Sequence, residues 1–236
     1  MIDYDLLKGE IDKLGIDIGE YGLDRFDQYA DYLVKWNKHV NLTAITEPDE
    51  IVIKHFVDCL NILKYVKIDK GQSLIDIGSG AGFPGMPLLI ANPELNVTFV
   101  DSVRKKLAFI KDVLHNTGMI AETQHARAEE LGRSNEFREK FDFVTARAVA
   151  QLNVLCEYCL PLVKVGGLFI AMKGASGKEE LEQANHAIEV LGGELAKFAE
   201  FTLSNGDKRS IIIIRKISQT PTKYPRKSKK IDTKPL

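Results

Sequence analysis

One short stretch of this sequence combines the residue types that bind small ligands. The apolar run Leu74–Ile77 contains the acid Asp76 and is followed by Gly78, Gly80 and Gly82. Glycine permits a positive φ and a close approach of a ligand to the backbone, because it has no Cβ. A strand that ends in such a turn and leads into a helix places the turn at the carboxyl edge of a parallel sheet, where α/β proteins bind ligands.

A second acid supports a nucleoside as the ligand. Asp101 follows Gly82 by 19 residues and ends the next apolar run, a position from which a carboxylate can accept hydrogen bonds from both ribose hydroxyls. The alternative is that Asp101 only caps the following helix. A dinucleotide-binding dehydrogenase would need glycine or alanine where this chain has Phe83. Asp76 before the glycines instead resembles the first motif of class I methyltransferases that use S-adenosylmethionine.

Short apolar runs alternate with helical stretches from residue 72 onward, which predicts an α/β fold with a mainly parallel sheet. We expect a helix over Val103–Thr117, ended by Gly118. The seven expected strands are Leu74–Ile77, Val97–Val100, Ala121–His125, Phe141–Thr145, Leu168–Met172, Leu195–Leu203 and Ser210–Arg215.

Three zones follow from these patterns. Residues 1–66 have helical periodicity and are expected to form an N-terminal helical cap. Residues 67–216 form the predicted ligand-binding core. Residues 217–236 carry three prolines and a net charge of +5, and we expect this basic tail to lack fixed structure alone.

Composition excludes several classes of protein. The chain has 236 residues, of which 44% are apolar and 28% charged, as in ordinary globular proteins. The longest apolar run, Met86–Ala91, is too short to cross a bilayer, and the acidic start lacks the features of a secretory signal. We therefore expect a cytoplasmic protein without a membrane segment. Cys156 and Cys159 lie in an apolar helical stretch without a second pair, so no metal site is expected.

Two absences narrow the reaction. Enzymes that methylate exocyclic amino groups of bases commonly carry an Asn or Asp-Pro-Pro-aromatic loop after the fourth strand, and Ala146-Arg147-Ala148 stands there instead. Methylation of cytosine carbon usually needs a nucleophilic cysteine. The cysteines of this chain are better interpreted as small buried side chains.

The ordered motifs resemble the small-subunit ribosomal RNA guanine-N7 methyltransferase family, also called glucose-inhibited division protein B. The match spans nearly the full chain, although Lys54 and Cys59 stand where many members have arginine and serine. The matching motifs are Trp36-Asn37-x-x-x-Asn41-Leu42-Thr43, His55-x-x-Asp58, the segment 76–85, Asp101-Ser102, Arg127-Ala128-Glu129-Glu130, Arg147-Ala148-Val149-Ala150, Lys173-Gly174 and Lys223-Tyr224-Pro225-Arg226-Lys227.

The resemblance implies a class I S-adenosylmethionine-dependent methyltransferase with a Rossmann-like seven-stranded sheet and an N-terminal helical cap. Together with the glycine turn and the second acid, it gives the expected cofactor contacts Gly78, Gly80, Phe83, Asp101, Ala128, Glu129 and Arg147. The alternatives are that Phe83 is a core aromatic residue and that Arg147 forms a surface ion pair. His55 and Asp58 share a helix face, where core hydrogen bonding or a lock between helix and loop is favoured over substrate contact.

The implied substrate is 16S ribosomal RNA or the small ribosomal subunit, with methylation at N7 of a guanine in the decoding-region loop. This nitrogen carries no proton, so its methylation needs no general base. No catalytic residue is therefore named. The expected RNA contacts are Lys223, Tyr224, Arg226 and Lys227. Methylation of a small molecule or protein, and nucleotide binding without catalysis, are the alternatives.

Overall fold

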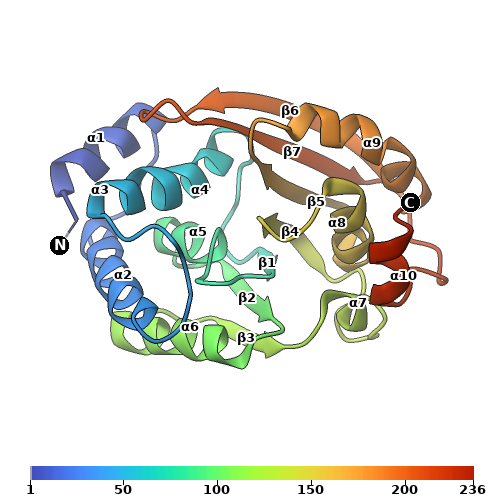
Figure 1. Ribbon diagram of the computed structural model, residues 1–236, viewed down its shortest axis with the longest axis horizontal. Helices are drawn as coiled ribbons and strands as arrows, with labels where there is room; N and C mark the ends of the chain where they lie inside the picture. Colours follow the sequence, from blue (N-terminus) through green and yellow to red (C-terminus); the bar gives the residue numbers. More distant parts are fainter. Residues whose placement is uncertain (1) are drawn as a thin grey trace.

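Seven strands form one sheet in the order β3-β2-β1-β4-β5-β7-β6 in the computed structural model, which describes residues 2–236 (Figure 1). The strands are β1 Ser73–Ile77, β2 Asn96–Asp101, β3 Glu122–His125, β4 Phe141–Arg147, β5 Val163–Lys173, β6 Gly193–Thr202 and β7 Lys208–Lys216. Neighbours from β3 to β5 are parallel, whereas β7 is antiparallel to β5 and β6. The seven predicted strands are confirmed, although β5 begins earlier than expected.

The strand order reverses between β1 and β4. From β1 the chain adds β2 and β3 on one side and then returns to add β4 on the other. Loops that leave the carboxyl ends of β1 and β4 therefore turn to opposite faces and leave a crevice between them. The glycine turn lies at this crevice, as predicted.

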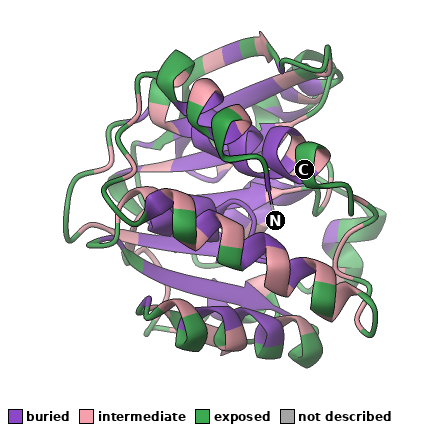
Figure 2. Ribbon diagram, turned by 90° about the vertical axis from the view of Figure 1, so that its left-hand side faces the viewer, coloured by how far each residue is buried: buried purple, intermediate pink, exposed green. Residues whose placement is uncertain are grey.

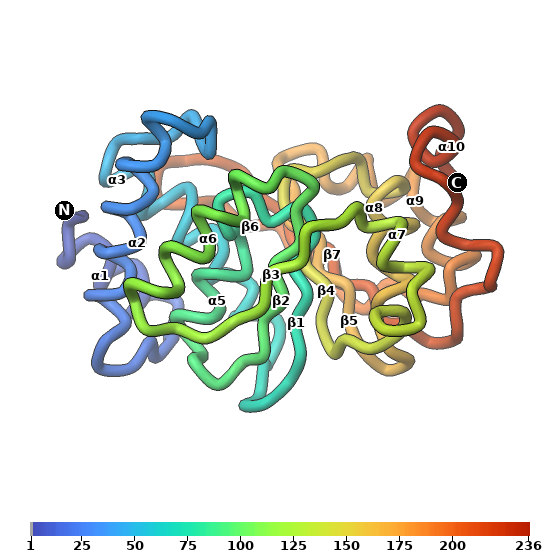
Figure 3. Tube along the Cα trace, turned by 90° about the horizontal axis from the view of Figure 1, so that it is seen from below, coloured from blue at the N-terminus to red at the C-terminus, as the bar shows by residue number. Residues whose placement is uncertain are grey.

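Helices cover both faces of the sheet, as Figures 1 and 3 show. The helices of one face include α1 Tyr4–Leu14, α2 Gly22–Asn37, α5 Gly85–Ala91 and α6 Arg104–Thr117. Those of the other face are α7 Ala128–Leu131, α8 Leu152–Cys159, η3 Leu160–Leu162, α9 Gly177–Val190 and α10 Ser228–Thr233. None of the helices within residues 2–236 is long and apolar enough to cross a membrane.

The N-terminal helices share one hydrophobic cluster with the sheet. On α2, Phe26, Tyr29 and Leu33 occur at helical spacing and are fully buried. The Tyr29 ring packs against Phe56 at 5.5 Å and Phe109 of α6 at 6.2 Å between ring centroids. Figure 2 shows that the buried positions of the helices face the buried strands. This packing places the N-terminal region directly beside the crevice.

A continuous helical segment joins this region to β1. It consists of α3 Pro48–Ile51, η1 Val52–Val57, α4 Asp58–Leu60 and η2 Asn61–Lys64. Its start at Pro48 agrees with the prediction, because proline in the first turn lacks only an N–H that would have no helical partner. The piece η1 is π-helical, a rare widening that is frequent at functional sites. The apolar periodicity of the sequence did not predict it.

Residues 217–236 pack on the helical layer that contains α7, α8 and α9. The expectation that this tail lacks fixed structure alone is therefore wrong. Tyr224 is only 7% exposed and Ile231 is fully buried. Arg138 donates hydrogen bonds to the carbonyls of Thr220 at 2.6 Å and Tyr224 at 2.8 Å. Apolar burial and this capture of backbone carbonyls order a segment whose composition alone resembles that of a disordered end.

Candidate functional site

The glycine turn is fixed to the end of β2 by hydrogen bonds. Gly78 and Gly80 have φ values of 67° and 58°, which residues with a Cβ rarely adopt. Ser79 Oγ accepts the N–H of Val100 at 2.9 Å. The Gly80 N–H donates to Asp101 Oδ2, also at 2.9 Å. The turn and the second predicted acid therefore form one rigid unit.

Asp76, the acid that precedes the glycines, is fully buried. Its Oδ2 accepts the Gly85 N–H at 3.1 Å, and its Oδ1 accepts the Thr145 hydroxyl at 2.8 Å. Burial raises the pKa of this carboxyl to about 7, although both hydrogen bonds oppose the shift. Asp76 thus joins the first residue of α5 to β4.

A pocket of about 330 Å³ lies at the carboxyl ends of β1, β2 and β3. The acidic residues Asp101 and Glu129, which are 6% and 8% exposed, belong to its lining. Besides the Gly80 contact, Asp101 Oδ1 accepts the Val103 N–H at 2.8 Å. Asp101 therefore also orders the entry to α6, as the capping alternative proposed. Each of its oxygens retains acceptor capacity for a ligand hydroxyl.

The structure divides the seven predicted cofactor contacts into two groups. Four of them line the smaller pocket, and Gly80 reaches it through Asp101. Those four are Gly78, Asp101, Ala128 and Glu129. Phe83 and Arg147 lie elsewhere and belong to the surroundings of a second pocket.

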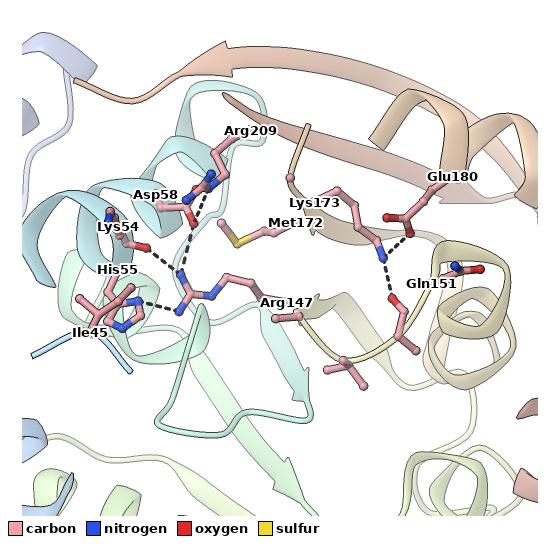
Figure 4. A pocket seen from close by; sticks show the side chains of 14 residues that line it. Ile45, Lys54, His55, Asp58, Arg147, Gln151, Met172, Lys173, Glu180 and Arg209 are labelled. Carbon is pink, nitrogen blue, oxygen red and sulfur yellow. Dashed lines mark hydrogen bonds and ion pairs between the residues drawn. The ribbon is translucent and has the colours of Figure 1, made fainter. Parts of the chain in front are cut away.

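This second pocket, drawn in Figure 4, has a volume of about 570 Å³. It adjoins the first pocket, because Ala148 and Val149 line both. Cationic side chains outnumber acidic ones in its lining, and each of these cations also forms an ion pair. The charged lining residues are Lys54, Arg147, Lys173 and Arg209 on the cationic side and Asp58 and Glu180 on the acidic side.

Arg147 points into this larger pocket, at the end of β4 (Figure 4). Its guanidinium donates to the Lys54 carbonyl and to Asp58 Oδ2, each at 3.2 Å, and to His55 Nδ1 at 3.1 Å. Its Cζ lies 4.5 Å from the centroid of the Phe83 ring, a cation–π distance. Arg147 and Asp58 thus form a largely buried ion pair rather than one on the surface. Phe83 is a core aromatic residue, 5% exposed.

His55 locks the π-helical turn to the preceding loop. Its Nε2 lies 2.8 Å from Thr43 Oγ1, and its ring stacks on Phe83 at 4.3 Å. Burial and the Arg147 charge lower its pKa to about 3. Because a guanidinium only donates, Nδ1 must accept and Nε2 must carry the hydrogen. His55 is therefore neutral with both ring nitrogens engaged, and the predicted lock between helix and loop is confirmed.

Asp58 lies between two guanidinium groups. Its Oδ2 is 3.2 Å from Arg147 Nη1 and 3.7 Å from Arg209 Nε. Its Oδ1 is buried and has no hydrogen-bond partner among residues 2–236. Burial raises the pKa of this carboxyl, and both guanidinium groups oppose the shift. Asp58 therefore holds two cations from distant parts of the chain at one wall of the pocket.

The four predicted RNA contacts also divide into two groups. Lys223 and Lys227 are exposed. Tyr224 is buried, and Arg226 Nη2 lies 2.6 Å from Oε2 of Glu157, whose side chain is fully buried. Tyr224 and Arg226 thus stabilise the fold, whereas the two lysines face solvent.

Sequence reasoning missed several lining residues of both pockets. Arg209 reaches the larger pocket from β7, and no motif surrounds it. Lys173 stood in a matched motif but was given no role; it forms an ion pair with Glu180 at 2.6 Å. Tyr158 lines the smaller pocket from α8. No group of three or more metal-ligating side chains occurs within residues 2–236.

Comparison with solved structures places the fold among class I methyltransferases. TrmN from Thermus thermophilus aligns with a TM-score of 0.53 and 18% identity, covering 68% of this chain and 48% of TrmN. The 16S rRNA (adenine(1408)-N(1))-methyltransferase from Catenulisporales acidiphilia aligns with a TM-score of 0.52 and 13% identity, covering 65% of this chain and 94% of that one. At such identities the likeness concerns the fold alone.

Sequence comparison is more specific. A family model described as rRNA small subunit methyltransferase G matches residues 23–212. The ribosomal RNA small subunit methyltransferase G of Acetivibrio thermocellus is 50% identical over 94% of this chain and 92% of its own length. That of Lactobacillus acidophilus is 46% identical over 96% of each chain. This chain therefore belongs to the rRNA small subunit methyltransferase G family.

Proposed function

We propose that this chain transfers a methyl group from S-adenosylmethionine to N7 of a guanine in the decoding-region loop of 16S ribosomal RNA. The observation that carries this function is the pair of adjoining pockets, one with two carboxylates and one rich in cations, which share Ala148 and Val149. Such a pair suits a nucleoside donor next to an anionic acceptor. Membership of the rRNA small subunit methyltransferase G family supports the same assignment.

The smaller pocket fits a nucleoside cofactor. Asp101 is held by the N–H groups of Gly80 and Val103, so its carboxylate is oriented before a ligand arrives. We assign it to the ribose hydroxyls, with Ala128 and Glu129 beside the adenine. Gly78 presents backbone to the methionine part. S-adenosylmethionine, when bound, supplies a methyl group on a sulfonium.

The larger pocket would receive the target guanine and its neighbouring phosphates. N7 of guanine is a lone-pair acceptor without a proton, so the chain needs to position the base and exclude water. The neutral and fully engaged His55 agrees with a site that moves no proton. Arg147, Lys54 and Arg209 are suited to phosphate oxygens or O6 of the base. A cation on N7 itself would oppose the positive charge that the methylated guanine gains.

The substrate form and the compartment belong to the same proposal. Exposed Lys223 and Lys227 would add phosphate contacts outside the pockets. The partner is 16S ribosomal RNA, free or within the small subunit, and the expected compartment is the cytoplasm, where ribosomal RNA is found.

The test is methyl transfer to ribosomal particles from a strain that lacks this gene. Labelled S-adenosylmethionine, the purified chain and small subunits are incubated, and the modified nucleotide is mapped. We expect one labelled 7-methylguanosine in the decoding-region loop, and no label with Asp101→Ala at low cofactor concentration. Label in another base, in protein or in a small molecule, or no transfer at all, would contradict the proposal.

A further inference from the structure

The folded C-terminal tail reaches the smaller pocket. We name residues 217–236 the C-terminal strap; its helix α10 lies beside α8 (Figure 1). Arg138 holds the carbonyls of Thr220 and Tyr224, and Arg133 Nε donates to the carbonyl of Pro225 at 2.8 Å. These contacts fix residues 220–225 of the strap.

Two consecutive residues of α8 connect the strap to the pocket. Glu157 is fully buried, and its carboxylate accepts the Arg226 backbone N–H at 2.7 Å and the Arg226 guanidinium at 2.6 to 3.0 Å. A buried carboxylate without such a partner would destabilise the fold strongly. The strap is therefore a structural requirement for α8.

The next residue, Tyr158, belongs to the lining of the smaller pocket. Its hydroxyl donates to Asp232 Oδ1 on α10 at 2.9 Å, and Ser228 Oγ donates to Asp232 Oδ2 at 3.3 Å. The pocket face of the Tyr158 ring is apolar and its polar tip is tied to the strap, which fixes the orientation of the ring. The neighbouring Lys229 and Lys230 on α10 are exposed.

We propose that the C-terminal strap is the outer support of the cofactor pocket and that Asp232 is a positioning residue, which acts by holding Tyr158 against the bound nucleoside. This inference rests on the proposed function for the identity of the cofactor. According to this inference the strap increases the affinity for the cofactor, and this role is separate from any contact of its lysines with RNA. Preorganisation of a wall residue lowers the ordering cost of binding.

The experiment measures S-adenosylhomocysteine binding by calorimetry on the full chain. Asp232→Ala and Tyr158→Phe should each raise Kd about three- to tenfold, as expected for one lost hydrogen bond. The double variant should be no weaker than either single variant, because both remove the same contact. Asp232→Asn retains an acceptor and should restore most of the affinity. Lys229→Ala/Lys230→Ala is the matched control on the same helix and should bind like wild type.

Steady-state kinetics separate this role from a contact with RNA. Asp232→Ala should raise KM for S-adenosylmethionine, with kcat at saturating cofactor and KM for small subunits unchanged. Wild-type cofactor affinity in both single variants, additive losses in the double variant, or a loss confined to KM for subunits would overturn the inference. If the wild-type chain bound no S-adenosylhomocysteine, the proposed function itself would fail, and the inference with it.

Discussion

The two pockets meet at Ala148 and Val149 but differ in charge. The smaller one has two acids, Asp101 and Glu129, and two cations, Lys106 and Arg127, whereas cations outnumber acids in the larger one. Carboxylates suit the hydroxyls of a nucleoside, and cations suit a polynucleotide. The difference indicates that cofactor binding and substrate positioning reside in separate residues, so that single substitutions should impair one and spare the other.

Arg147→Ala should have the largest effect and should spare the cofactor. We expect kcat on small subunits to fall at least about 100-fold, with Kd for S-adenosylmethionine within about threefold of wild type, because Arg147 lies in the larger pocket. Single-turnover transfer and calorimetry measure the two quantities. A cofactor Kd raised tenfold with unchanged kcat would instead place Arg147 in cofactor binding.

Stability must be measured beside activity for this variant. Removing Arg147 takes from the buried Asp58 the closer of its two cationic partners, which should destabilise the fold by about 3 kcal/mol. Arg147→Lys keeps the charge but loses the planar set of guanidinium donors. Relative to Arg147→Ala, we expect it to recover more of the stability than of the activity. Equal recovery of both would mean that Arg147 acts through the fold alone.

Glu129→Ala should show the converse pattern. We expect Kd for S-adenosylmethionine to rise at least about tenfold, roughly 1.4 kcal/mol, with kcat at saturating cofactor unchanged, because Glu129 lines the smaller pocket. Calorimetry and steady-state kinetics measure the two quantities. The exposed Glu122→Ala is the matched control. Unchanged affinity in Glu129→Ala would remove this carboxylate from the cofactor site.

His55 should make the stability of the fold sensitive to acid. Its folded pKa of about 3 lies below its ordinary value of 6.5, so the stability it contributes is present above pH 6.5 and is lost as pH falls toward 3. His55→Gln removes this proton uptake. The difference in unfolding free energy between wild type and variant should narrow by about 1 kcal/mol between pH 6 and pH 5.

Urea unfolding at several pH values measures this difference, and the exposed His186→Gln is the control. A difference that stays constant with pH would show that His55 is protonated in the folded state at pH 5. The lock between Thr43 and Arg147 would then need a different hydrogen-bond assignment.

Lys223→Ala/Lys227→Ala should have the smallest effect. These side chains are exposed, so we expect KM for small subunits to rise only a few-fold, with a salt dependence that is shallower by about 0.7 to 0.9 per lost phosphate contact. Cofactor affinity should not change. KM measured over a range of salt concentrations provides the check, and an unchanged salt slope would remove these lysines from RNA binding.

Sequence alone predicted the sheet and four residues of the smaller pocket, because these residues lie at or after strand ends within short motifs. Gly78 follows β1, Asp101 ends β2, and Glu129 follows β3. The larger pocket was not predictable in this way. Arg209 meets Asp58 only after β7 packs beside the helical segment, and the π-helical turn changes which side chains share a face.

The C-terminal tail shows the limit of composition as evidence. Charge and proline content indicated disorder, but Arg226 neutralises the buried Glu157, and the buried Tyr224 and Ile231 supply apolar contacts. Partners of this kind lie tens of residues away in sequence, so no local pattern reveals them.

The central claim is that the nucleoside cofactor occupies the smaller pocket, next to a separate pocket for the base. A crystal structure with S-adenosylhomocysteine tests it most directly. We expect the ribose at Asp101, the adenine beside Ala128 and Glu129, and the sulfur directed toward the boundary at Val149. Cofactor bound among Arg147, His55 and Arg209, or a crystal in which the smaller pocket stays empty at saturating ligand, would contradict the account.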